Sequence, residues 1–387
     1  MTTAPFSGAI PLTVSGTAAG AEKTQGQLSV PKTPRSDVNM TKPLANPYKA
    51  QPEKAFWKAS VGVRHYADFA HLWQPMPLQK SDKIATAGSC FAQHIGNNLA
   101  LRGAAFMDME PAPPIFASEA EARRWGYGVF SCRYGNIYTS RQLIQLFDEA
   151  HGQRTPKEVV WQKNGRFFDA LRPGIDPIGQ ERAEDVIALR QLHLGAVKRM
   201  FAELDVFVFT MGLTEGWELV ADGTMFPVAP GTTAGEYRAE DYRFHNLRAA
   251  EIRDDMLAFW TRLRSVNPKA RMLLTVSPVP LAATATAQHV LVATSYSKSV
   301  LRAVAGELAE DTPDIFYFPS YEIISTHPYR GTFFEPDLRN VNLHGVNHVM
   351  SHFFSGALAA EFSFAASPPQ AHKEIELICD EAALDPS

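Results

Sequence analysis

The side chain best placed to do chemistry is Ser89, because it lies where a strand pattern changes into a helical one. Residues 84–87 form a short apolar run, and apolar residues then recur at helical spacing over residues 91–99, so Ser89 is expected on a strand-to-helix turn. The first N–H groups of a helix have no intrahelical partner and can stabilise an oxyanion that forms at the serine. Gly88 permits the sharp turn. The competing interpretation is that Ser89 is only the N-cap of the helix.

The residues around this turn carry a family resemblance. Residues 88–92 read Gly-Ser-Cys-Phe-Ala, which is the signature of the GSCFA family. The chain is similar to that family in further segments, which lie in order at residues 135–138, 210–215, 276–279, 297–299 and 317–322. The family in turn resembles the SGNH (GDSL-like) hydrolases, whose nucleophile is a serine after the first strand. The resemblance implies a three-layer α/β/α fold of the flavodoxin-like type, and an esterase, lipase or carbohydrate acetyl transferase or deacetylase.

The resemblance also implies an oxyanion hole made by the serine N–H, a glycine and an asparagine. Gly135 corresponds to the second of these blocks and is followed by Asn136, although Gly-Asn is also an ordinary turn sequence. Gly212 begins the third block, where the superfamily has Gly-x-Asn-Asp. Here Thr214 replaces the asparagine, so the donor is its hydroxyl, a backbone N–H or another group. Glu215 ends the block and is expected to orient a base or to bind a substrate hydroxyl.

The catalytic base is the point at which the chain departs from the superfamily. An Asp-x-x-His is expected near the C-terminus, and Asp337 matches its first position, but Asn340 occupies the histidine position. A serine hydroxyl needs an adjacent base, so another histidine must supply it. His327 is the first choice because it follows the last predicted strand, and His344 is the alternative. Asp337 would orient the base or hold the loop.

The elements that must position these residues alternate between short apolar strands and amphipathic helices. This alternation predicts an α/β fold with a mostly parallel, open sheet that helices cover on both faces. Ligands bind beyond the carboxyl ends of the strands in such sheets, so Ser89, Gly212 and Ser277 are expected to converge on one crevice. A short strand is also expected over residues 104–107, and loop insertions over residues 158–177 and 222–244.

The predicted organisation is a disordered tail over residues 1–51, a GSCFA (SGNH-like) α/β domain over residues 52–366, and a flexible tail over residues 367–387. The first 51 residues are rich in Thr, Ala, Gly, Pro and Ser and hold few large apolar groups, so they cannot offset the entropy cost of ordering.

The bulk composition excludes several classes of partner. The net charge is −4, which favours neither nucleic acid nor an anionic membrane surface. No signal peptide and no membrane span are expected, so we place the protein in the cytoplasm. Its three cysteines, Cys90, Cys132 and Cys379, fit reduced thiols better than a disulfide framework. No metal site or cofactor is expected, and the oligomeric state is left open.

These observations favour a serine-dependent esterase or acyltransferase that acts on an acylated carbohydrate or a similar small ester. Whether water or a sugar hydroxyl accepts the acyl group is open. A second hypothesis, motivated by Thr214 and Asn340, is a catalytically degenerate SGNH-like module that binds a glycan or an acyl group. A third makes Cys90 the nucleophile of a thioesterase.

Overall fold

The computed structural model describes residues 46–355, 358 and 362. Most of the predicted N-terminal tail and the whole of the predicted C-terminal tail lie outside these residues. The chain divides into two compact units, residues 1–52 and 53–387. The described part of the first unit contains one short helical turn, η1 (Pro47–Ala50), whose first N–H groups are capped by the Asn46 side chain.

The second unit is built on a four-stranded parallel sheet, as predicted. Its strands follow the order β1-β4-β8-β9, with β1 (Ile84–Gly88), β4 (Val206–Met211), β8 (Arg271–Val276) and β9 (Ile315–Phe318). The strand expected over residues 104–107 is reduced to a single bridge from Phe106 to Ile84. Its backbone bonds run from the Ile84 N–H to the carbonyl oxygen of Ala105 at 3.0 Å and from the Met107 N–H to that of Ile84 at 2.9 Å.

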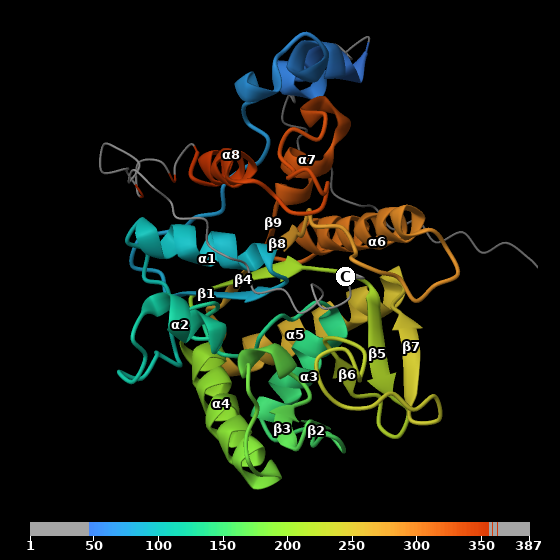
Figure 1. Ribbon diagram of the computed structural model, residues 1–387. Coiled ribbons are helices and arrows are strands. Elements are labelled where there is room, and N and C mark those ends of the chain that lie inside the picture. Colours follow the sequence, from blue (N-terminus) through green and yellow to red (C-terminus); the bar gives the residue numbers. More distant parts are fainter. Residues whose placement is uncertain (1–45, 356–357, 359–361, 363–387) are drawn as a thin grey trace, which may run out of the picture. The chain divides into compact units, whose positions relative to one another are not determined.

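Helices cover both faces of this sheet, because alternate residues of the buried strands point to opposite sides. Val206 and Val208 pack with α1 (Phe91–Leu101), α7 (Ser320–Ser325) and α8 (Leu343–Phe353). Phe207 and Phe209 pack on the other side. The helices there are α3 (Ser140–Ala150), α4 (Ala183–Glu203), α5 (Ala249–Val266) and α6 (Val290–Asp311). Figure 1 shows α1 and α8 on one side of the sheet and α3, α4 and α5 on the other. The result is the three-layer α/β/α arrangement.

The remaining elements are insertions between the core strands. A hairpin of β2 (Val160–Lys163) and β3 (Arg166–Asp169) lies within the insertion expected over residues 158–177. The insertion expected over residues 222–244 contributes to a second, antiparallel sheet of order β6-β5-β7, formed by β5 (Glu215–Leu219), β6 (Met225–Phe226) and β7 (Tyr242–Asn246). Short helices complete the unit: η2 (Glu53–Ala55), η3 (Lys58–Gly62), η4 (Tyr66–Asp68), α2 (Glu119–Arg124), η5 (Pro173–Ile175) and η6 (His327–Tyr329).

Candidate functional site

Ser89 lies on the predicted strand-to-helix turn, directly after β1. The preceding Gly88 has φ of +133°, a conformation that L side chains rarely adopt. The Ser89 N–H donates to the carbonyl oxygen of Thr210 at 3.1 Å, which extends the β1–β4 pairing by one residue. This bond fixes the backbone that carries the serine.

The side chain of Ser89 is not a helix cap. The N-cap position of α1 is Cys90, and no side-chain capping hydrogen bond is present there. Ser89 is only 3 % exposed, and within the described part of the chain its Oγ atom has no hydrogen-bond partner. Buried hydroxyl groups are nearly always paired, and an exception calls for a functional or structural explanation.

The Oγ atom of Ser89 has such an explanation in the small cavity beside it, which we call the Ser89 cavity. Ser89, Gly212 and Ser277 follow β1, β4 and β8, and all three line it, so the expected convergence at the carboxyl ends of the strands is observed. The full lining is Ser89, Cys90, Tyr138, Gly212, Leu213, Ser277, Val279, Pro280, Leu281 and Lys298.

Lys298 is the lining residue that the sequence reasoning missed. It is 2 % exposed and lies on α6, and its Nζ atom donates to the carbonyl oxygen of Gly212 at 2.6 Å. The neighbouring Ser297 accepts from the N–H of Thr214 through its Oγ atom, at 3.0 Å. The family segment at residues 297–299 therefore holds the loop after β4, and its presence was the sequence signal that could have pointed to Lys298.

Gly212 lies against Ser89. A methyl group on Gly212 would stand 3.1 Å from the Cβ atom of Ser89 and 3.1 Å from the carbonyl oxygen of Tyr138. The Gly212 N–H itself donates to that carbonyl oxygen, also at 3.1 Å. The glycine is thus required for close approach of two backbones at the serine, and its N–H is engaged within the protein.

The predicted donor Thr214 is engaged as well. Its hydroxyl donates to Oδ1 of Asn246 at 2.7 Å, while its N–H donates to Ser297 as described above. Thr214 is fully buried. Its groups therefore join the loop after β4 to α6 and β7.

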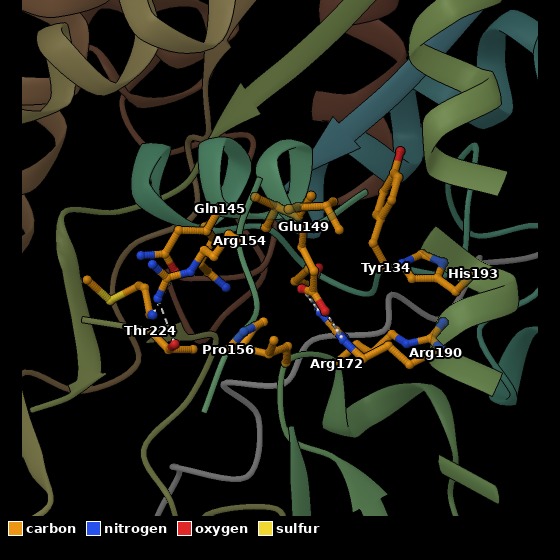
Figure 2. A pocket seen from close by; sticks show the side chains of 15 residues that line it. Tyr134, Gln145, Glu149, Arg154, Pro156, Arg172, Arg190, His193 and Thr224 are labelled. Atoms are coloured by element: carbon orange, nitrogen blue, oxygen red, sulfur yellow. Dashed lines mark hydrogen bonds and ion pairs between the residues drawn. The ribbon is translucent and has the colours of Figure 1, made fainter. Parts of the chain in front are cut away.

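Gly135 and Asn136 are not among the residues that line the Ser89 cavity, although the Ile137 N–H that follows them donates to the carbonyl oxygen of Gly88 at 2.9 Å. Gly135 has φ of +66°, and a methyl group on it would contact Ile175 and Arg172. Asn136 lines a different cavity, which is shown in Figure 2 and which we call the Arg190 cavity. Its further lining includes Tyr134, Gln142, Gln145, Glu149, Arg154, Arg172, His193 and Thr224.

Charged groups of the Arg190 cavity pair with one another or with acidic residues next to the lining. Arg190 forms ion pairs with Glu149 and, at 2.8 Å, with Asp169, which also pairs with Arg172 at 2.6 Å. Burial alone would raise the pKa of Asp169, but the two guanidinium groups hold it at about 2. His193 pairs with Glu110 at 2.7 Å. The buried charges are therefore explained by a structural role, because the pairs of Arg190 join α4 to α3 and to β3.

Glu215 lies beside the Ser89 cavity, in a second hollow that we call the Glu215 groove. This groove shares Leu213 and Leu281 with the Ser89 cavity, and Trp217 and Phe244 supply aromatic surface to it. The Glu215 carboxylate accepts from the Thr284 hydroxyl at 2.7 Å and from the Ala285 N–H at 3.2 Å. Burial outweighs these bonds and raises the pKa of Glu215 above its usual value.

The two histidines predicted to supply the base, and Asp337, predicted to orient it, are not among the residues that line the Ser89 cavity. His327 stacks on Trp57 with ring centroids 5.4 Å apart, in a separate hollow that includes Phe316 and Tyr329. His344 packs its ring 5.3 Å from that of Phe333.

Asp337 lies in an exposed turn and binds the residue that replaced the expected histidine. Its Oδ1 atom accepts from the N–H groups of Arg339 and Asn340, both at 2.9 Å. Its Oδ2 atom accepts from Nδ2 of Asn340 at 2.6 Å. The carboxylate therefore stabilises its own turn.

Among the described residues, no three His, Cys, Asp or Glu side chains come together in a way that could hold a metal ion. In the same part of the chain, every helix is too short or too polar to serve as a membrane span.

A comparison with models of protein families gives a match. The model of the GSCFA family matches residues 83–353, a range that begins just before β1 and ends with α8. No curated protein matches the chain.

Proposed function

The chain belongs to the GSCFA family, and from this membership and the geometry of the Ser89 cavity we propose that it is a serine-dependent esterase or acyltransferase. The observation that carries the proposal is the Oγ atom of Ser89, which is buried, lacks a hydrogen-bond partner in the described part of the chain and borders a cavity at the carboxyl ends of three parallel strands. α1 begins two residues further on, at Phe91, so the positive end of its dipole lies near any oxyanion that forms there.

The reaction would proceed through an acyl-enzyme. Ser89 Oγ attacks the carbonyl carbon of the ester, and the alcohol leaves with the proton that the hydroxyl gave up. Water or an acceptor hydroxyl then attacks the acyl-serine and releases the acid or the new ester, which restores the Ser89 hydroxyl.

The proposed substrate is an acylated carbohydrate or a similar small ester. Support comes from the Glu215 groove, which adjoins the Ser89 cavity through Leu213 and Leu281. A sugar can pack its apolar face on Trp217 and donate a hydroxyl to the Glu215 carboxylate, while its acyl group enters the Ser89 cavity.

A fluorophosphonate probe tests the proposal without knowledge of the substrate. Ser89 Oγ should displace fluoride and form a phosphonyl adduct, which peptide mass spectrometry locates. We expect one adduct in the wild-type protein, none in Ser89→Ala, and retention of the adduct in Cys90→Ala. An adduct on Cys90 would support the thioesterase hypothesis instead.

The second candidate is a catalytically degenerate module that binds a glycan or an acyl group. The observation in its favour is that His327, His344 and Asp337 all lie outside the lining of the Ser89 cavity. A folded wild-type protein that forms no adduct, together with binding of an acylated sugar that Ser89→Ala retains, would support this candidate and overturn the first.

A further inference from the structure

The Ser89 cavity contains a buried lysine that no part of the predicted catalytic apparatus uses. Lys298 is 2 % exposed, although a lysine is seldom buried without a specific role. It reaches the cavity from α6, on which Ser297 and Leu301 are also buried. Burying an ammonium group costs free energy, so its position beside a serine suggests a chemical function.

Lys298 is also the lining residue best suited to take a proton. Of the ten lining residues, Lys298, Tyr138 and Cys90 carry side chains that titrate. A phenol and a thiol are proton donors at neutral pH, whereas removal from water favours the neutral form of an amine, which has a lone pair. None of the described residues that line the cavity is a histidine.

The hydrogen bond of Lys298 suits this role. Its Nζ atom donates one N–H to the carbonyl oxygen of Gly212 at 2.6 Å, and Gly212 in turn packs against the side chain of Ser89. The bond holds the amine in the lining that Lys298 shares with Ser89. A neutral amine that donates one N–H also carries a lone pair that can accept a proton.

We propose that Lys298 is the general base that activates Ser89, in place of the histidine of the superfamily. This inference rests on the function proposed above. Serine–lysine pairs support acyl transfer on unrelated folds. Lys298 takes the proton of the Ser89 hydroxyl as Oγ bonds to the acyl carbon, and the resulting ammonium gives that proton to the departing alkoxide as the ester C–O bond breaks. In deacylation it takes a proton from water or the acceptor hydroxyl and returns it to Ser89 Oγ.

The test measures the rate at which the fluorophosphonate modifies Ser89 in the full chain. Lys298→Met and Lys298→Arg should both lose about 100-fold to 10,000-fold in rate, which is the usual contribution of general-base catalysis. Arginine keeps the charge and can donate to Gly212 but cannot accept the proton. A matched control is Lys269→Met, since this lysine is exposed and pairs with Asp205 at 2.7 Å; it should react at the wild-type rate.

Chemical rescue separates proton transfer from packing. In Lys298→Ala, small alkylamines should restore labelling in proportion to the concentration of the neutral amine. Thermal unfolding verifies that each variant is folded. If Lys298→Met and Lys298→Ala do not fold, the labelling rate of Lys298→Arg tests the proposal by itself.

The outcomes distinguish the inference from the function on which it rests. Wild-type rates in Lys298→Met or Lys298→Arg would overturn the inference, and in the second case would indicate a role for positive charge alone. If His327→Ala loses labelling while the Lys298 variants react at the wild-type rate, His327 is the general base. Failure of the wild-type protein to react at all would overturn the proposed function itself.

Discussion

Gly88 and Thr210 lie so close that a methyl group on Gly88 would stand 2.7 Å from the backbone nitrogen of Thr210 and 2.9 Å from its carbonyl carbon. The two residues are partners in the parallel pairing of β1 with β4. The close approach occurs where β1 turns toward α1, immediately before Ser89. The contact between Gly88 and Thr210, which pairs β1 with β4, therefore also sets the direction in which the chain continues to Ser89.

Gly88→Ala should destabilise the protein by about 3 kcal/mol or more, since it adds both steric overlap with backbone atoms and an unfavourable φ. Chemical denaturation measures the change. Gly152→Ala is the matched control, because Gly152 has φ of +70° but open space around it, and it should cost about 1 kcal/mol. Equal costs in the two variants would show that the contact with Thr210 is not limiting.

Ser89→Ala should leave the free energy of unfolding unchanged or raise it by about 1 kcal/mol, because the substitution removes a buried hydroxyl without a partner in the described part of the chain. The comparison is Thr139→Ala. The Thr139 hydroxyl caps α3 by accepting from the Gln142 N–H, so its loss should cost about 1 kcal/mol. If Ser89→Ala costs as much, the serine is a structural cap after all.

Gly212→Ala should lower the rate of fluorophosphonate labelling by roughly 10-fold to 100-fold, because the new methyl group displaces the Ser89 side chain from its place in the cavity. Gly195→Ala on α4 serves as the control. The nearest neighbour of a methyl group there is the flexible end of Arg199, at 3.7 Å, so this variant should gain about 0.5–1 kcal/mol in stability with normal labelling. Normal labelling in Gly212→Ala would place the serine farther from the glycine than the structure does.

The fold and the position of Ser89 could be predicted because both depend on local pattern. The apolar run at residues 206–211 is long enough for a strand buried on both faces, and it became β4. Parallel strands place their carboxyl ends at one edge, so Ser89, Gly212 and Ser277 could be expected together without any knowledge of side-chain contacts.

The polar partners could not be predicted because they depend on how distant elements pack. Lys298 reaches the Ser89 cavity from within a long helix, and the family segment at residues 297–299 marks its position without showing that its side chain is buried or which residues it contacts. His327 follows a strand, but α7 intervenes after β9 and carries the chain to the hollow around Trp57. Gly135 lies against Ile175 and Arg172, and Asn136 lines the Arg190 cavity; these contacts depend on how segments distant in the sequence pack together.

Arg190→Met should destabilise the protein by about 3–5 kcal/mol, because it leaves the buried carboxylates of Glu149 and Asp169 with fewer partners. Figure 2 marks the ion pair between Arg190 and Glu149 with dashed lines. Arg182→Met is the control, since the Arg182–Asp185 pair is exposed, and it should change stability little. Ser89 labelling should stay normal in both variants, which distinguishes the Arg190 cavity from the Ser89 cavity; loss of labelling in folded Arg190→Met would connect them.

Acid should destabilise the protein through histidines that are buried in their neutral form. Burial and the nearby charge of Arg123 lower the pKa of His94 to about 4, and burial with neighbouring histidines does the same for His348. An unfolded histidine titrates near 6.5, so between about pH 6.5 and pH 4 the unfolded state binds more protons than the folded state. Above pH 6.5 the free energy of unfolding should therefore be at its full value with respect to these histidines. It should fall as the pH falls, by up to about 1.4 kcal/mol per pH unit for each such histidine.

His94→Gln tests this directly, because it removes one titrating ring while leaving the other histidines in place. Urea unfolding measured from pH 8 to pH 4 should give a shallower slope for the variant than for the wild type, by about one proton. The difference at pH 8, where the ring is neutral in both states, reports the effect of packing alone and serves as the internal control. Parallel curves with the same slope would show that His94 becomes charged as readily in the folded protein as in the unfolded chain.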